Sequence, residues 1–103
     1  MGFSMSNNTK SIGKAIDSVA KYWGDMMPIM TMEESGELIQ AISKLERFYK
    51  SDFKDESEEN ALKQNLVDEM GDAIIAIQAL RIHYGIEDDA IHKRINKKLS
   101  KEY

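Results

Sequence analysis

The apolar residues of this chain recur at intervals of three and four, which is the spacing of a helix face rather than the alternation of a strand. The pattern predicts four helices, at residues 9–23, from 28 or 31 to 49, 58–84 and 87–101. Gly24 and Gly85 follow the first and third of these, where glycine commonly ends a helix. Pro28, the single proline, lies near the start of the second, where helices tolerate it. We therefore expect an all-α fold, with residues 9–103 as one domain.

The second half of the third predicted helix, residues 73–80, is apolar on nearly every side. Such a helix must be covered on more than one face, and a chain of 103 residues buries only a limited share of its surface by itself. We expect the four helices to form a bundle that assembles as a homodimer or homotetramer. Residues 1–8 show no helical pattern, and we expect a disordered segment or an expression remnant ahead of a native start at Met5.

The composition excludes several classes of function. The chain has no cysteine, which rules out disulfides, thiolate zinc sites and cysteine nucleophiles and suits a reducing compartment. Its formal net charge of −4 argues against a nucleic-acid polymer or an anionic membrane as a partner. No basic segment followed by an apolar run marks a secretory signal, so we predict a cytoplasmic protein.

Two groups of acidic residues interrupt the apolar faces of the second and third helices. They are Glu33, Glu34 and Glu37, and Glu69 and Asp72. At about 100° per residue, Glu34 and Glu69 lie within the apolar stripes of their helices, and Glu37 lies at the edge. Unpaired buried carboxylates are costly and repel one another, so these two faces need a cation between them in order to pack. Oxygen ligands without histidine or cysteine favour Mg²⁺, with Mn²⁺ as a possible substitute.

Ordinary structural roles for the same acidic residues stay open. Thr31-x-x-Glu34 also fits a capping box, in which Glu34 would satisfy the start of a helix. Glu37 could pair with a neighbouring lysine or arginine on a solvated face. Glu69 and Asp72 could be surface acids.

Taken together, Glu33-Glu34-x-x-Glu37 and Glu69-x-x-Asp72 resemble the signature of the MazG-type all-alpha nucleoside triphosphate pyrophosphohydrolases. Further stretches are similar to that family, at residues 37–44, 68–74, 83–86 and 91–97. The resemblance implies a four-helix MazG-like domain that hydrolyses a (d)NTP to the monophosphate and pyrophosphate, in house-cleaning or control of nucleotide pools. It implies that Mg²⁺ is held by Glu34, Glu37, Glu69 and Asp72. Glu33 would hold a further ion or take the proton of the attacking water.

A triphosphate needs cationic and aromatic partners besides the metal. The candidates for phosphate and nucleotide binding are Lys44, Lys93, Asn96, Lys97 and Trp23. Lys44 projects from the edge of its helix that carries Glu37, and the three residues of the last helix share one face. Trp23 could stack on a base, although it also completes an apolar stripe.

Three other functions remain as alternatives. A phosphoribosyl-ATP pyrophosphohydrolase would use similar carboxylates. A di-iron four-helix protein would need Glu-x-x-His pairs, which neither acidic group contains. A non-catalytic helical interaction module would keep the carboxylates without turnover.

Overall fold

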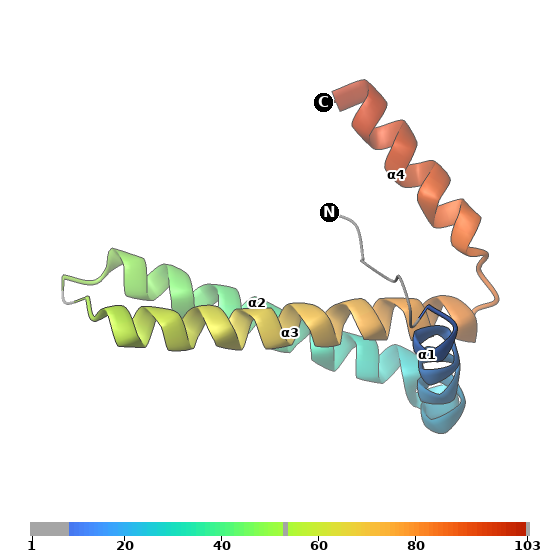
Figure 1. Ribbon diagram of the computed structural model, residues 1–103, viewed down its shortest axis with the longest axis horizontal. Coiled ribbons are helices and arrows are strands. Elements are labelled where there is room, and N and C mark those ends of the chain that lie inside the picture. Colours follow the sequence, from blue (N-terminus) through green and yellow to red (C-terminus); the bar gives the residue numbers. More distant parts are fainter. Residues whose placement is uncertain (1–8, 53, 103) are drawn as a thin grey trace.

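The computed structural model describes residues 9–52 and 54–102, and nearly all of these are helical (Figure 1). The helices are α1 (Thr9–Trp23), α2 (Met27–Lys50), α3 (Glu56–His83) and α4 (Asp88–Glu102), with a short 3-10 turn, η1 (Gly24–Met26), between α1 and α2. The described residues contain no strand, so the prediction of an all-α chain with four helices is confirmed. The prediction for residues 1–8 lies outside the described residues. Among those described, no helix is long and apolar enough to cross a membrane.

The observed boundaries correct two details of the prediction. Helix α2 begins at Met27, and Thr31 lies inside it, with its Oγ1 donating to the Met27 carbonyl at 2.8 Å. The alternative of a capping box at Thr31 is therefore wrong. Helix α3 begins at Glu56 rather than 58, because the Asp55 side chain accepts a hydrogen bond from the Ser57 backbone N–H at 3.0 Å and caps the helix.

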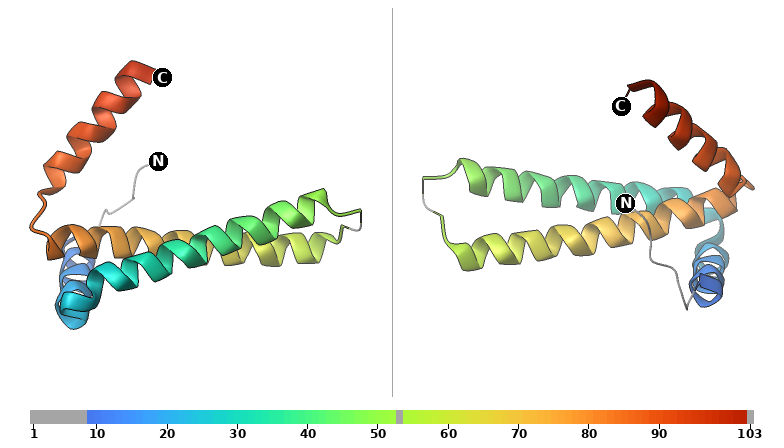
Figure 2. Two further views of the ribbon diagram at one scale, coloured as in Figure 1. Left: turned by 180° about the vertical axis from the view of Figure 1, so that it is seen from behind. Right: turned by 45° about the horizontal axis from the view of Figure 1, so that its top comes forward.

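Helices α2 and α3 form a long antiparallel hairpin, and α1 packs across the end where α2 begins and α3 ends (Figures 1 and 2). Gly24 and Gly85 have positive φ angles of 49° and 67°, which lets the chain turn sharply after α1 and after α3. Beyond Gly85, α4 extends away from the other helices. The four helices therefore do not close into a bundle within one chain, which corrects the picture of a bundle with α4 as its fourth member.

The buried core is thin and built largely from alanine. Where α1 meets the hairpin, it consists of Ala20, Met27, Ala76 and Ala79. Further along the hairpin the buried residues are Ala41, Leu45, Phe48 and Ala73. The buried residues of α3 are all alanines. Because the alanine side chain is short, the neighbouring helices must approach α3 closely to bury it.

We expect Ala79→Leu to destabilise the protein by about 1–3 kcal/mol, because Ala79 has no exposed surface and a larger side chain would force the packed helices apart. The matched control is Ala61→Leu on the same helix, where the side chain is exposed and we expect a change within about 0.5 kcal/mol. Urea unfolding followed by circular dichroism measures both. Equal effects of the two substitutions would contradict this packing.

Candidate functional site

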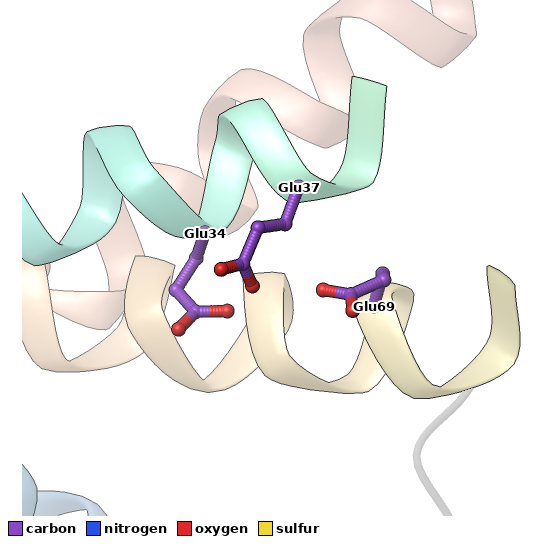
Figure 3. Close-up of side chains that lie close together, drawn as sticks. All are labelled: Glu34, Glu37 and Glu69. Carbon is purple, nitrogen blue, oxygen red and sulfur yellow. The ribbon is translucent and has the colours of Figure 1, made fainter. Parts of the chain in front are cut away.

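Three carboxylates meet between α2 and α3, midway along the hairpin (Figure 3). They belong to Glu34 and Glu37 of α2 and Glu69 of α3, and one oxygen atom from each lies within 4.8 Å of the others. Glu34 and Glu37 are one helical turn apart, so both side chains project from the same side of α2. The antiparallel packing of α3 brings Glu69 opposite them. The structure thus brings together three of the four residues that the sequence predicted as metal ligands.

Two of these carboxylates are partly buried without a partner. Glu34 and Glu69 are half-buried, and the Oε2 atom of each is removed from solvent and accepts no hydrogen bond. Glu37 is exposed at the opening of the cluster. Native structures rarely leave a buried polar atom unsatisfied, since it loses its hydration without compensation. Among the described residues, the two Oε2 atoms are therefore left without compensation for the hydration that they lose.

The cluster also changes the ionisation of its members. Burial, followed by the charges of Glu37 and Asp72, raises the pKa of Glu34 above its ordinary value. Burial, followed by the charge of Glu37, likewise raises the pKa of Glu69. Both shifts have the same cause, since negative charge is confined where water screens it poorly. A cation in the cluster would reverse this effect.

The other two predicted acidic residues lie beside the cluster. Asp72 is exposed one turn after Glu69, and its charge contributes to the raised pKa of both Glu34 and Glu69. Glu33 is exposed next to Glu34 and contributes to the raised pKa of that residue. Both are close enough for their charges to act on the cluster, although neither has an oxygen among the three that converge.

Within the described part of the chain, no lysine, arginine or histidine forms an ion pair with these acidic residues. The ion pairs that form are Lys50–Glu46, Lys63–Glu59, Arg81–Asp88 and His92–Asp88. Among the described residues, Glu37 therefore does not form the ion pair with a neighbouring lysine or arginine that was considered as an alternative. Over residues 9–52 and 54–102, the negative charge of the cluster is therefore left without an ion-pair partner.

The predicted nucleotide-binding residues lie in three places. Lys44 is exposed on α2, two turns beyond Glu37, where it lines a shallow groove near the turn of the hairpin. Arg47, which is not among the predicted residues, lines the same groove one turn further on. Its spacing of three residues from Lys44 could have indicated that the two share a helix face.

The remaining candidates lie outside the hairpin. Lys93, Asn96 and Lys97 are exposed on α4. Within a single chain, α4 extends away from the hairpin that carries the carboxylate cluster (Figure 1). Trp23 ends α1 with 37% of its surface exposed, and its ring packs edge-on against Tyr22 at 5.1 Å. The structure therefore places the carboxylates close together. The binding roles of Lys93, Asn96, Lys97 and Trp23 stay predictions.

These features describe an all-oxygen site whose negative charge no protein cation balances among the described residues. Its donor atoms come from two helices that pack against each other along their length, which holds the carboxylates in place. Comparison of the chain with protein-family models, with curated proteins and with solved structures finds no match.

Proposed function

We propose that this chain is a Mg²⁺-dependent nucleoside triphosphate pyrophosphohydrolase that converts a (d)NTP into the monophosphate and pyrophosphate. One observation carries the proposal: Glu34 and Glu69, whose carboxylates converge with that of Glu37, each hold a buried Oε2 atom that has no hydrogen-bond partner among the described residues. An all-carboxylate donor set of this kind fits a hard divalent cation. The resemblance to the MazG-type signature connects the same residues to this reaction, and membership of that family is part of the proposal.

The residues that would hold Mg²⁺ are Glu34, Glu37 and Glu69, with Asp72 as a fourth ligand at the edge. Bound Mg²⁺, with Mn²⁺ as a substitute, would neutralise phosphate oxygens and favour ionisation of a water molecule. Glu33 lies exposed beside the cluster and is proposed to take the proton of the attacking water. The water oxygen bonds to the α-phosphorus, and the bond to the bridging oxygen breaks, so that pyrophosphate leaves.

The proposal assigns the triphosphate and the nucleoside to residues around the cluster. Lys44 on α2 is proposed to contact the phosphates, because it is an exposed cation on the same helix as Glu34 and Glu37. Lys93, Asn96 and Lys97 are proposed to assist from α4, and Trp23 is proposed to stack on the base. We further propose that the enzyme acts as a homodimer or homotetramer.

The test is to incubate the purified chain with a panel of NTPs, dNTPs and phosphoribosyl-ATP in Mg²⁺ or Mn²⁺ and to separate the products. We expect monophosphate and pyrophosphate. In ¹⁸O-labelled water, the label is expected in the monophosphate, because water attacks the α-phosphorus. Diphosphate with free phosphate would contradict the proposed reaction. Absence of turnover with either metal would favour the non-catalytic helical module.

A further inference from the structure

The groove near the turn of the hairpin is not used by the proposed reaction, except through Lys44. It has a volume of about 350 Å³. Its lining residues come from both sides of the hairpin and are Lys44, Arg47, Phe48, Ser51, Glu58 and Leu62. Binding sites for small molecules measure about 300–1,000 Å³ and combine an apolar lining with a few polar groups. The groove therefore has the size and the composition of a site for one small molecule.

The groove lies in line with the carboxylate cluster. Glu37, Lys44 and Ser51 are seven residues apart, which is close to two helical turns, so they form a row along one side of α2. Leu62 and Glu69 have the same spacing on α3. At about 1.5 Å per residue, the groove begins about 10 Å from the cluster in the direction of the turn. A ligand held at the cluster can therefore extend into the groove.

The lining of the groove changes with distance from the cluster. Lys44 is the nearest cation, and Arg47 follows it one turn further along α2. On the antiparallel α3, Glu58 lies one turn further from the cluster than Leu62 does. Phe48, which is 7% exposed, and the partly buried Leu62 supply the apolar floor. A ligand that enters from the cluster therefore meets a cation first, then an apolar floor between a second cation and a carboxylate.

The charged groups that line the groove do not neutralise one another. Among the described residues, Lys44, Arg47 and Glu58 form no ion pair. The Nε atom of Arg47 donates a long hydrogen bond to the Ser43 carbonyl at 3.4 Å. Within the described chain, this leaves the terminal nitrogens of the guanidinium group available to a ligand. The groove thus presents donors on α2 and an acceptor on α3 to a molecule that carries both kinds of group.

We propose that this groove binds a second nucleoside, so that the substrates include dinucleoside polyphosphates, in which a phosphate chain joins two nucleosides. The inference rests on the proposed pyrophosphohydrolase. Lys44 contacts the phosphate chain as it leaves the cluster. The base lies on the apolar floor with the Arg47 guanidinium group against its face, and Glu58 accepts a hydrogen bond from an amino group of the base. A phosphate group alone would leave the apolar floor unused and would be repelled by Glu58.

This arrangement places the two nucleosides on opposite sides of the cluster. Trp23, which is proposed to stack on the first base, ends α1, and α1 packs at the end of the hairpin away from the turn (Figure 1). The second nucleoside lies towards the turn, and the phosphate chain must span the distance of about 10 Å from the cluster to the groove. The length of the phosphate chain therefore selects among substrates.

The reaction breaks the same kind of bond in the longer substrate. With diadenosine tetraphosphate, the water oxygen bonds to the α-phosphorus at the cluster, and the water proton passes to Glu33. The bond from that phosphorus to the bridging oxygen breaks. The products are AMP at the cluster and ATP, which leaves with its adenosine in the groove. In ¹⁸O-labelled water, the label is expected in AMP.

The test compares kcat/KM for diadenosine triphosphate, tetraphosphate and pentaphosphate with kcat/KM for ATP in Mg²⁺. We expect the tetraphosphate or the pentaphosphate to exceed ATP by about tenfold, which is the effect of one stacked base. The triphosphate should not exceed ATP, because its chain is too short to reach the groove. Arg47→Ala/Glu58→Ala should return the ratio of the longer substrates to ATP to about one. This ratio is insensitive to the fraction of folded protein.

The matched control is Glu46→Ala/Lys50→Ala, which also removes one carboxylate and one cation. These two residues pair with each other at 2.8 Å outside the groove, so the preference should remain. Equal kcat/KM for ATP and all three dinucleotides would overturn the inference even if ATP is hydrolysed. A preference that survives Arg47→Ala/Glu58→Ala, or that is lost equally in the control, would show that the groove is not the site.

A binding measurement separates this inference from the proposed reaction. Calorimetry with diadenosine tetraphosphate and with ATP in Ca²⁺, which also binds carboxylates, requires no turnover. Tighter binding of the dinucleotide that is lost in Arg47→Ala/Glu58→Ala would support the groove even if neither compound is hydrolysed, in which case the proposed reaction alone fails. Equal affinities, or no binding of either compound, would overturn the second nucleoside site.

Discussion

Replacing Glu37 by alanine is expected to lower pyrophosphohydrolase turnover by at least about a hundredfold while the helices stay folded. Glu37 is the exposed member of the three converging carboxylates, so it faces both the cluster and solvent, where a substrate would enter. Loss of one ligand to a catalytic cation removes several kcal/mol of charge stabilisation, and about 1.4 kcal/mol corresponds to a factor of ten in rate. Initial rates of pyrophosphate release at saturating Mg²⁺ measure the effect.

The same substitution is expected to raise the melting temperature in the presence of a chelator. Among the charges that raise the pKa of Glu34 and of Glu69, that of Glu37 is the largest for each. Removing it relieves repulsion in the metal-free protein. A residue that served only the fold would lower the melting temperature when truncated, so lost activity together with a raised melting temperature distinguishes a site residue from a structural one.

The matched control is Glu46→Ala, which removes an exposed carboxylate from the same helix. Glu46 pairs with Lys50 at 2.8 Å on the surface, and exposed pairs of this kind contribute little stability. We expect its turnover and melting temperature to stay close to those of the wild type. If Glu37→Ala kept the turnover of the wild type, the carboxylate cluster would not be the active site.

The carboxylate cluster was predictable from the sequence because charged residues stand at positions where the helical pattern requires apolar ones. Glu34 and Glu69 occupy positions that helical periodicity assigns to a buried face, and the chemistry of burial requires a reason for them. When α2 and α3 pack their buried faces together, the acidic residues of both helices meet at one place. The existence and order of the helices were predictable for a similar reason, since a spacing of three and four residues is repeated over many turns.

The start of α2 was harder to predict because no side chain caps it. Helix α2 follows η1 directly, and Met26 at its N-cap makes no side-chain hydrogen bond. Thr31, which resembles a cap in sequence, instead bonds backward to a carbonyl within the helix. A cap is recognised by residue type, whereas the break between α1 and α2 depends on the positive φ of Gly24. The pattern therefore left two starts open, and the earlier one, Pro28, lies one residue from the observed start at Met27.

The direction of α4 was not predictable from periodicity. It is set after Gly85 by contacts of Arg81, whose Nη1 donates to the Ile86 carbonyl at 2.9 Å and whose Nε lies 3.8 Å from Asp88. These contacts join residues on either side of a turn, and helical spacing carries no information about them. Lys93, Asn96 and Lys97 were predicted to bind nucleotide because they share one face of α4. A shared helix face does not indicate which part of the protein or which ligand that face contacts.

The other large effect that we expect is a reversal by Mg²⁺ of how stability depends on pH. In the metal-free protein, Glu34 and Glu69 have pKa values above the ordinary 4.5. Above that pH the folded state therefore holds more protons at these groups than the unfolded state does. Their contribution to stability is complete below the unfolded pKa and is lost as the pH rises through the raised, folded pKa. In a chelator, this contribution to the melting temperature should decline from about pH 4.5 towards neutrality.

Mg²⁺ should act in the opposite direction, because it binds the ionised carboxylates of the folded state. At a concentration one hundred times its dissociation constant, a ligand adds about 2.7 kcal/mol to the free energy of unfolding. For a domain of this size, that corresponds to roughly 10–20 °C in melting temperature. The increase should be large at pH 7.5 and small near pH 5, where protons compete for the same oxygens.

The double variant Glu34→Gln/Glu69→Gln separates the cluster from the other ionisable groups of the chain. Glutamine keeps the size of each side chain and removes the ionisable proton, so both the decline without metal and the gain with Mg²⁺ should disappear. Glu59 provides an internal contrast, since its hydrogen bond from Tyr49 lowers its pKa and its contribution to stability is instead lost as the pH falls. That contribution should persist in the variant. Mg²⁺ stabilisation that survived the double substitution would show that the ion binds elsewhere, and the two unpartnered oxygens would then need another explanation.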